Sequence, residues 1–500
     1  MTSTEQVTFD CDTLIVGMGT SGLLAAYALL RAQPGTRVLL VDSGLPLDER
    51  LARGDTSANG YGGAGLYLGG RLYVGESTIP VMPPVSVPPE MRPVVAGAAY
   101  AQLAREVNDL FDALGATGAL QSAPAEPLAQ AIEQAHAVGI DYVTSYPSRY
   151  LSAPERHAIL RGLRERVEAQ GGRLLFGAQM SEAQRVDGGF RLALVRNHEQ
   201  SGSELDHESD TKPDAEPLPQ HVRARALLLA PGRYGAEWLM RVAGELGARS
   251  LSLAPTVGVR IEVAASGYNP LTDVNPDPRL QMAVEGDALI KTYATCPGGR
   301  VAAIMRYGSV VATGIPVLKR DERGTQTTVA ILAQPGAEAA QGAWKGGEQI
   351  ARRLNARADN RLIVQRLGDV RQQRATTVEE LATNTIQPSC ADAIPGALYD
   401  AYPAAYWQAF ETFLARLNQL APGVASDETL LYGPAEERFQ HFPTDDGLQT
   451  TTLGLFVAGD APGQSQGIIQ AGVAGLLAGE GLARYRAENI RGRGYFSSDR

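Results

Sequence analysis

Two glycine-rich elements stand at opposite ends of the 500-residue chain. Residues 12–22 read DTLIVGMGTSG, and residues 454–460 read GLFVAGD. Each joins a short apolar run to glycine, which is the pattern of a strand buried on both faces of a parallel sheet and ending in a tight turn. Because open parallel sheets bind ligands at the carboxyl ends of their strands, we expect both elements to meet at one sheet edge. The first domain is therefore predicted to be built from both chain ends.

The N-terminal element has the glycine spacing of a dinucleotide-binding fingerprint. Gly17 permits the turn out of the strand, Gly19 lets the backbone approach a pyrophosphate, and Gly22 lets the next helix pack closely on the strand. The first N–H groups of that helix, with Thr20 and Ser21, are predicted to face the phosphates, because helix N-termini bind anions.

An acidic residue follows the second predicted strand, at residues 37–41. Asp42 stands 20 residues after Gly22, which is the spacing of the acid that accepts a hydrogen bond from a ribose hydroxyl. We predict that Asp42 and the adjacent Ser43 belong to the nucleotide site. The alternative interpretation of this region is a glycine-rich turn that holds no ligand.

The C-terminal element has its own chemistry. Its strand ends on Gly459 and Asp460, where the carboxylate can accept a hydrogen bond from a ribityl hydroxyl. The following helix begins at Gly467 and Ile468, and its positive N-terminus would stabilise an anionic reduced flavin. Alone, the Gly-Asp pair is better explained as a plain turn. Joined to the N-terminal fingerprint, it favours FAD over a freely exchanging NAD.

Two further segments are predicted to close around the same cofactor. Residues 59–75 hold so many glycines that neither helix nor strand is expected, and Gly63, Ala64 and Gly65 are predicted to wrap the backbone around the ligand. A flexible surface loop is the alternative. An apolar run that ends on Ala230, just before Gly232, is expected to return the chain to the first sheet.

The predicted fold is α/β, with a Rossmann-like FAD-binding domain formed by residues 1–254 and 426–500. Residues 255–425 are predicted to form an inserted substrate domain, an α+β unit with a mixed or antiparallel sheet, because short β-branched runs recur there. Helices are expected to follow near 340–355 and 396–420.

Local patterns complete the first domain. Helices are predicted near 97–115 and 153–169, and residues 174–176 and 190–195 are predicted to be strands of a small meander. Residues 197–220 are acidic and nearly free of large apolar side chains, which predicts a solvated, mobile insertion. The histidines in and beside it are predicted to be surface residues rather than metal ligands: His198, His207 and His221.

Composition excludes several other classes of protein. A hydrophobic share of 44%, a net charge of -10 and a pI near 5.3 are typical of a globular protein and argue against a nucleic-acid binder. The 3 cysteines are far apart, so no disulfide framework or metal site is expected. The N-terminus lacks the pattern of a signal peptide, and no apolar run predicts a membrane span. A cytoplasmic location is the expectation.

Several motifs occur together in an order that resembles a family of bacterial FAD-dependent dehydrogenases, mostly uncharacterised, within the glutathione-reductase-like flavoprotein superfamily. They are residues 62–65 (GGAG), 230–239 (APGRYGAEWL), 257–262 (VGVRIE), 296–299 (CPGG) and 459–460 (GD). The resemblance covers most of the chain apart from the acidic insertion, and it implies FAD without naming a substrate. This chain departs from the superfamily in having Asp42 where Glu is common, and Asp-Ala-Pro-Gly after Gly459.

Few side chains are candidates for catalysis. Cys296 could act as a nucleophile or acid/base only if its pKa were lowered, and apolar packing is the alternative. His441 could carry a proton, although a satisfied loop histidine explains it better. Arg71 and Arg306 could each hold a carboxylate or be plain surface charges. Tyr67 and Tyr293 could border the flavin or belong to the core, and no metal site is predicted.

The predicted function is an FAD-dependent dehydrogenase that transfers a hydride between a small organic substrate and flavin N5. Only one complete fingerprint is present, so we expect the substrate to reduce non-covalent FAD directly, with NAD(P)H at most a transient reductant. The alternatives are an NAD(P)H-using flavin monooxygenase or reductase, and a redox-inert flavoprotein that acts as a binding protein. The oligomeric state is open.

Overall fold

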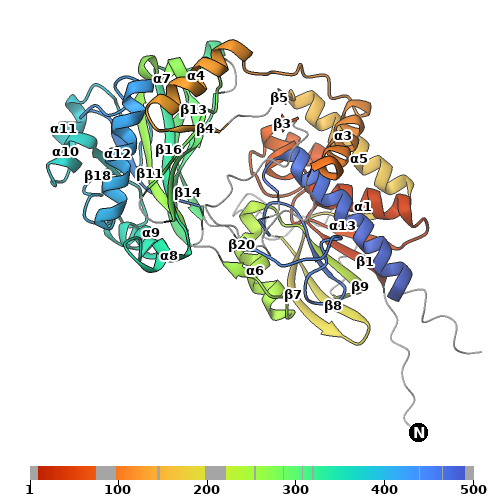
Figure 1. The fold of residues 1–500 in the computed structure, drawn as a ribbon. Coiled ribbons are helices and arrows are strands. Elements are labelled where there is room, and N and C mark those ends of the chain that lie inside the picture. Colours follow the sequence, from red (N-terminus) through yellow and green to blue (C-terminus); the bar gives the residue numbers. More distant parts are fainter. Residues whose placement is uncertain are drawn as a thin grey trace, which may run out of the picture.

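The structure, a computed structural model, divides the chain into two lobes, which Figure 1 shows side by side. It describes residues 10–74, 97–143, 147–197, 221–252, 255–284, 287–306, 308–317, 320–437, 440–463 and 465–489. The predicted insertion lies outside the described residues from position 198 onward, and so do His198 and His207. His221 is exposed at the start of a strand.

The first lobe contains a parallel sheet whose strand order is β6-β2-β1-β9-β21. These strands are β1 (Cys11–Val16), β2 (Val38–Val41), β6 (Arg173–Leu175), β9 (His221–Leu229) and β21 (Leu455–Val457). The register joins Leu14 to Leu227 and Leu227 to Leu455, so the two chain ends lie on either side of one central strand. This confirms the α/β class and the sheet built from both ends.

The helices α1 (Thr20–Ala32) and α13 (Ile468–Asn489) pack against each other on this sheet, as Figure 1 shows. Glycines in α13 permit the close approach. A Cβ added at Gly475 would lie 2.5 Å from the carbonyl oxygen of Ser21, and one added at Gly479 would lie 2.6 Å from that of Ala25. The glycines of the C-terminal helix therefore allow its close packing on α1.

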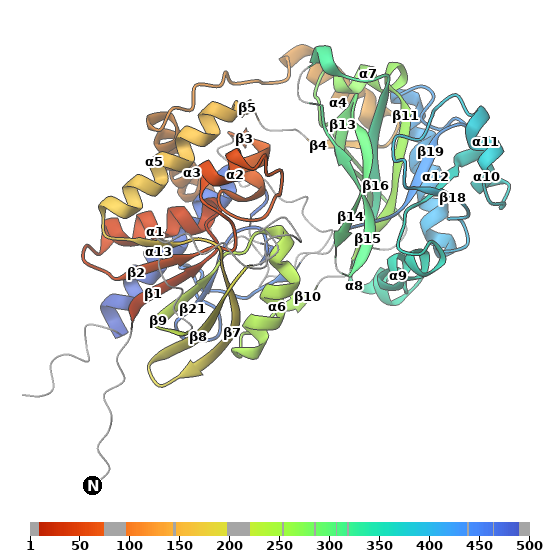
Figure 2. The same ribbon diagram turned by 180° about the vertical axis from the view of Figure 1, so that it is seen from behind.

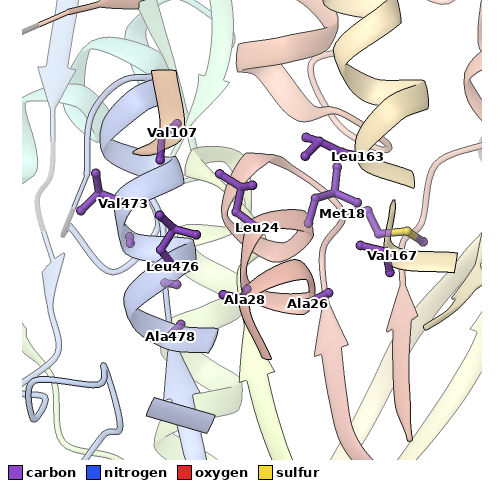
Figure 3. Packing of buried hydrophobic residues seen from close by; sticks show 14 of the residues in the cluster. Met18, Leu24, Ala26, Ala28, Val107, Leu163, Val167, Val473, Leu476 and Ala478 are labelled. Atoms are coloured by element: carbon purple, nitrogen blue, oxygen red, sulfur yellow. The ribbon is translucent and has the colours of Figure 1, made fainter. Parts of the chain in front are cut away.

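Two further helices complete this layer, α3 (Gly97–Ala113) and α5 (Ala153–Ala169), and both agree with the predicted ranges. Figure 3 shows how each of these helices packs on the rest of the lobe. Val107 of α3 lies beside α13, and Leu163 of α5 lies near Met18. The remaining helices of this lobe are α2 (Leu47–Ala52) and α6 (Ala236–Glu245), with a short 3-10 helix η4 (Arg233–Gly235) before α6.

Two local predictions in this lobe are wrong. Residues 173–175 form the parallel edge strand β6 rather than a meander strand, and the antiparallel hairpin consists of β7 (Ala178–Val186) and β8 (Gly189–Arg196). Residues 59–75 do contain regular structure, namely the π-helix η1 (Gly63–Gly69) and β3 (Arg71–Tyr73), which pairs with β5 (Ser148–Tyr150). Left-handed glycines, Gly62 and Gly70, stand at both ends of η1, so glycine bounds this helix instead of preventing it.

The second lobe is built on an 8-stranded sheet of order β18-β17-β19-β11-β16-β13-β12-β4, in which only the β17–β18 pair is parallel. Its strands are β4 (Asp141–Val143), β11 (Thr256–Ala264), β12 (Arg279–Ala283), β13 (Ala288–Pro297), β16 (Gln326–Pro335), β17 (Ile363–Arg366), β18 (Ile394–Pro395) and β19 (Leu430–Glu437). A two-stranded ladder of β10 (Leu251–Ser252) and β20 (Gln440–His441) lies between the lobes in Figure 1.

Helices cover one face of the second sheet and a hairpin covers the other. The covering helices are α4 (Ala125–Ala137), α7 (Ala265–Thr272), α8 (Ala337–Gln341), α9 (Gly347–Arg357), α10 (Leu367–Arg371) and α12 (Ala404–Leu420). The helix α11 (Val378–Thr383) lies on the hairpin side, because its Leu381 shares a core with the hairpin residues Val301 and Val310. The lobe also contains the 3-10 helix η5 (Arg320–Glu322). Residues of β11 that face α12, including Val257, Val259 and Ile261, share one core with it. Figure 2 shows the hairpin of β14 (Arg300–Arg306) and β15 (Ser309–Ile315) on the side toward the first lobe.

The strand pairing differs from the predicted division of the chain in two places. β19 pairs with β11 and β17, although the predicted return to the first domain began at residue 426. β4 comes from the predicted first domain and pairs with β12 at the opposite edge of the second sheet. Both differences involve pairing partners distant in sequence, which no local pattern specifies.

We expect Gly479→Ala to destabilise the protein, because its Cβ would lie 2.6 Å from both the Ala25 carbonyl oxygen and the Ala28 Cβ. Overpacking of this kind lowers the free energy of unfolding by about 1–3 kcal/mol. The matched control is Gly244→Ala in α6, where nothing lies within 4 Å and the change should be neutral or slightly stabilising. Urea unfolding measures both variants, and equal effects would contradict this account of the packing.

Candidate functional site

The turn after β1 gives its three glycines different surroundings. Gly17 has φ of +101°, and a Cβ there would collide with the Ala230 carbonyl oxygen. A Cβ on Gly22 would collide with the carbonyl oxygen of Gly17. By contrast, no atom lies within 4 Å of the Cβ position of Gly19, whose φ of -76° suits any residue. The fold therefore needs glycine at 17 and 22, whereas position 19 faces open space.

Asp42 fastens this turn to the end of β2. Its carboxylate accepts hydrogen bonds from the N–H groups of Met18, at 2.6 Å, and Gly44, at 2.8 Å. Burial raises the pKa of Asp42, and the two N–H groups and the charge of Arg50 oppose that rise. The neighbouring Ser43 is half-buried, and its carbonyl oxygen accepts a hydrogen bond from Asn197. If Asp42 also accepts a hydrogen bond from a ribose, it must use the same carboxylate oxygens that already accept from Met18 and Gly44.

The π-helix η1 lies against the same turn. The Gly62 N–H donates to the Met18 carbonyl oxygen at 3.0 Å, and the Cβ position of Gly63 is 3.7 Å from the Cα of Gly19. A Cβ on Gly65 would lie 2.9 Å from the Ile468 side chain. Ala64 is exposed between these two glycines. The predicted wrapping segment thus reaches both the first turn and the start of α13.

The C-terminal element arrives at the same place. A Cβ on Gly459 would lie 2.9 Å from Ser21 Oγ, and that hydroxyl donates to the Ala471 carbonyl oxygen at 2.8 Å. The hydroxyl of Ser21 therefore joins α1 to α13. Thr20, beside it, is buried at the start of α1.

The loop after Asp460 and the first turn of α13 contain buried polar atoms that lack a hydrogen-bond partner among the described residues. Ser465 is 2% exposed and Gln470 is 6% exposed. The hydroxyl of Ser465 and both side-chain polar atoms of Gln470 have no hydrogen-bond partner among the described residues. Buried polar groups in native proteins usually have a hydrogen-bond partner, so a ligand at this edge would have polar atoms available to bind.

Ala230 and Gly232, at the end of β9, complete the arrangement. Ala230 contacts the turn at Gly17, and Gly232 has φ of +69° with nothing within 4 Å of its Cβ position. The predicted cofactor residues from five separate segments therefore surround the carboxyl edge of one sheet. The side chain of Asp460 extends from this edge to Arg233, with 3.8 Å between its Oδ2 and Arg233 Nη1.

Arg71 lies where the two lobes meet. Its Nη1 is 3.9 Å from Asp277 Oδ2 of the second lobe. Its guanidinium carbon lies 4.6 Å from the centre of the Tyr73 ring and 5.4 Å from that of Tyr150. Arg279 approaches the same Tyr73 ring at 5.7 Å. We call these five residues the inter-lobe arginine cluster.

Sequence reasoning found only Arg71 of this cluster. Asp277 and Arg279 precede or begin a short strand, where no periodic pattern marks them. The sole local signal is the Asp-Pro-Arg order, which predicts a turn and no chemistry. Their proximity to Arg71 depends on the packing of one lobe on the other.

Cys296 does not meet the condition set for a nucleophile. It is 3% exposed, and burial raises its pKa, although Arg260 opposes that rise. Arg260 Nη2 donates to Cys296 Sγ at 3.3 Å, and a Cβ on Gly314 of β15 would lie 2.6 Å from the same sulfur. The hairpin therefore encloses the thiol, and the packing interpretation fits these contacts.

The remaining candidates are spread over the molecule. His441 is buried in β20, opposite Leu251 of β10, and the described contacts do not bring it to the inter-lobe arginine cluster. Tyr67 donates its hydroxyl to the Asp55 carbonyl oxygen and lies under the guanidinium of Arg50, so it belongs to the core. The others stand near the lobe boundary: Arg306 lies 5.9 Å from the Tyr234 ring, and Tyr293 OH accepts from Arg233 at 3.3 Å.

The strand motif at 257–262 carries a buried charge that the sequence did not reveal. Glu262 Oε2 accepts hydrogen bonds from the Tyr432 hydroxyl, at 2.6 Å, and from the Ser389 N–H, at 3.2 Å. Burial raises the pKa of Glu262, and these two donors oppose that rise. The motif therefore describes the interior of the second sheet.

Neither a metal-binding cluster nor a membrane-spanning helix occurs in the described part of the chain. No group of three or more His, Cys, Asp or Glu residues there is arranged to hold a metal ion. Likewise, none of the described helices combines the length and the apolar composition needed to cross a membrane.

The chain matches no protein-family model and no curated protein. Among solved structures it is similar to glycine oxidase from Geobacillus kaustophilus, at 13% identity over 95% of each chain and a TM-score of 0.35. It is similar to a 3-ketosteroid-delta4-(5alpha)-dehydrogenase from Rhodococcus jostii RHA1, at 13% identity over 96% of this chain and 98% of that chain, with a TM-score of 0.40. A third is aklavinone-11 hydroxylase in complex with FAD and aklavinone, at 14% identity over 98% and 64%, with a TM-score of 0.36.

Similarity at these scores says nothing of activity, and the predicted membership of one dehydrogenase family stays a prediction.

We expect Glu262→Gln to change how stability depends on pH. Because folding raises the pKa of Glu262, the unfolded chain releases the proton first as pH rises above about 4.3, the ordinary value for glutamate. The wild type therefore loses stability from there toward neutral pH, whereas the variant does not. The difference between the melting temperature of the variant and that of the wild type should therefore increase, in favour of the variant, as pH increases.

Tyr432→Phe is the matched control, because it removes a donor to Glu262 and keeps the carboxyl group. Its melting temperature should fall more steeply with pH than that of the wild type. Parallel profiles for the wild type and Glu262→Gln would contradict the assigned cost of the buried charge.

Proposed function

We propose that the protein is an oxidoreductase that holds FAD non-covalently at the carboxyl edge of the first sheet. The observation that carries this proposal is the convergence of Gly19, Gly63 and Gly459 around one edge. The buried side chains of Ser465 and Gln470, which follow Gly459 along the chain, have no hydrogen-bond partner among the described residues. Gly19 offers backbone with no side chain in front of it, as close approach by a pyrophosphate requires.

The residues present fit the different parts of this cofactor. The N-terminus of α1 would hold the pyrophosphate, because its first N–H groups have no partner within the helix. Asp42 would accept from the ribose, and Asp460 from the ribityl chain. The N-terminus of α13, at Gly467 and Ile468, would favour negative charge on the ring.

FAD, when bound, supplies the capacity to accept a hydride, and the protein supplies position, charge and exclusion of water. Asp460 is linked to the second lobe through Arg233, which donates to Tyr293 OH at 3.3 Å. These side chains would close the lobe boundary beside the ring and orient a small organic substrate there. Cys296 is left out of the proposed reaction, because it is enclosed and its pKa is raised.

Direct reduction by the substrate is the favoured reaction, which makes the protein a dehydrogenase. The sequence contains one complete dinucleotide fingerprint, and in the structure that fingerprint forms β1, α1 and β2. A reductase or monooxygenase that uses NAD(P)H would need a second nucleotide to reach the same edge without such a motif.

We expect Gly19→Val to abolish or strongly weaken FAD binding while the chain still folds. The position has space for a side chain and an ordinary φ of -76°, so the apoprotein should keep its melting temperature within a few degrees. The matched control, Gly244→Val, lies in α6 and should retain the flavin. FAD content, read from the absorbance of purified protein, checks this prediction. A variant that retains full FAD would contradict it.

The reaction itself is tested by anaerobic titration of the holoprotein with NADH, NADPH and a panel of small acids, amines and alcohols. Loss of the oxidised flavin absorbance with an organic compound supports the dehydrogenase. Loss with NADPH alone indicates a reductase or monooxygenase. A purified protein that neither carries nor binds FAD would overturn the proposal.

A further inference from the structure

We propose that the substrate carries a carboxylate, and that Arg71 and Arg279 of the inter-lobe arginine cluster bind it. This inference rests on the proposed function, because it assigns the substrate side of the same site. The two arginines come from different lobes, Arg71 from β3 and Arg279 from the first position of β12.

The cluster has more positive than negative charge. Asp277 is its only carboxylate, and one of its oxygens already accepts the Thr295 N–H at 3.0 Å. Asp277 approaches Arg71 only to 3.9 Å, which leaves that pair without a close hydrogen bond. Within the cluster, one carboxylate therefore faces two guanidinium groups, and a second carboxylate would balance the charge.

The donors of Arg71 are held ready for such a group. Its side chain is 21% exposed, and its Nε is buried without a hydrogen-bond partner among the described residues. The Tyr73 and Tyr150 rings flank the guanidinium and restrict its direction. A forked guanidinium held in one plane suits two-point binding of a carboxylate, and partial burial strengthens the attraction.

The electrostatics around the cluster agree with this excess of positive charge. Burial opposes the charge of Arg279, but Asp277 and Tyr73 raise its pKa above the ordinary value, so it stays charged. Burial raises the pKa of Tyr150, while the charges of Arg71 and Arg323 oppose that rise. A third arginine thus contributes positive potential at the Tyr150 hydroxyl.

The cluster lies beside the part of the proposed flavin site at the start of α13. The Tyr73 ring is 3.4 Å from the Cβ position of Gly467, immediately before α13. Tyr73 therefore contacts the two arginines and also approaches the N-terminus of α13, which would face the flavin ring. A carboxylate held by Arg71 and Arg279 would fix one end of the substrate while its reacting carbon extends toward α13.

The test uses the purified holoprotein and pairs of probes that differ in charge but hardly in shape: benzoate with benzamide, and acetate with acetamide. Binding is followed by the change in flavin absorbance and, independently, by the melting temperature. We expect at least one carboxylate to bind at least tenfold more tightly than its amide. Inorganic phosphate is tested in the same way, because its binding would reveal a site that accepts any anion.

The variants are Arg71→Gln, Arg71→Lys and Arg279→Gln, with Arg320→Gln as the matched control. Arg320 pairs with Asp273 on the second lobe and is 72% exposed, and none of its described contacts reaches the inter-lobe arginine cluster. We expect Arg71→Gln and Arg279→Gln each to weaken carboxylate binding at least tenfold and the control to leave it unchanged. Arg71→Lys keeps the charge but loses the fork, so it should fall between them. If Arg71→Gln fails to fold, the other two variants decide.

Equal binding of acid and amide would overturn the inference, and so would variants whose dissociation constants stay within twofold of the wild type. Binding of phosphate that exceeds binding of every carboxylate would replace it with a general anion site. The two proposals fail separately. If an uncharged substrate reduces the flavin and no carboxylate binds, only this inference is overturned and the proposed function stands. Absence of flavin removes the proposed function, and the melting temperature with benzoate still tests the cluster.

Discussion

The close packing of α1 on α13 is the constraint on which the rest of the structure depends. These helices come from opposite ends of the chain, and they approach so closely because Gly475 and Gly479 present no side chains to the α1 backbone. The Ser21 hydroxyl then reaches the Ala471 carbonyl oxygen across the contact. The same packing sets β21 beside β9, which brings Gly459 to the turn after β1. A large side chain at this contact would separate the two halves of the candidate site.

The two lobes contribute different kinds of groups to their boundary. The first lobe supplies backbone, through glycine-rich turns and two helix N-termini, which suits a cofactor of fixed shape. It also supplies side chains of the inter-lobe arginine cluster, among them Arg71 and Tyr150. The second lobe supplies charged and hydroxyl side chains, among them Asp277, Arg279 and Tyr293. We therefore expect substitution of these second-lobe side chains to alter the proposed substrate region with little effect on the proposed cofactor region.

Much of the first lobe could be predicted because its signals are local. The fingerprint strand and helix, the strand ending at Ala230 and the strand before Gly459 are each short apolar runs next to glycine, and each pairs as expected. The helix at 153–169 is marked by a capping box at Ser152 and Glu155 and was predicted at its observed bounds.

What could not be predicted depends on contacts between distant parts of the sequence. β4 and β19 are ordinary short strands, and only their partners, about which the local sequence carries no information, place them in the second sheet. Asp277 and Arg279 gain significance only when Arg71 arrives from the other lobe. Burial likewise decided against a reactive Cys296, because the enclosing hairpin is not visible in the residues around it.

The route of the chain between the lobes limits how they can move. β4 ends at residue 143 in the second sheet and β5 begins at 148 on the first lobe, while the β10–β20 ladder marks another crossing, which Figure 1 places at the other end of the boundary. The chain therefore joins the lobes near both ends of their boundary, so we expect any relative motion of the lobes to be a rotation about the axis that joins these crossings. The inter-lobe arginine cluster includes Tyr150 of β5, so it stands close to one end of that axis, where a swing displaces its members least.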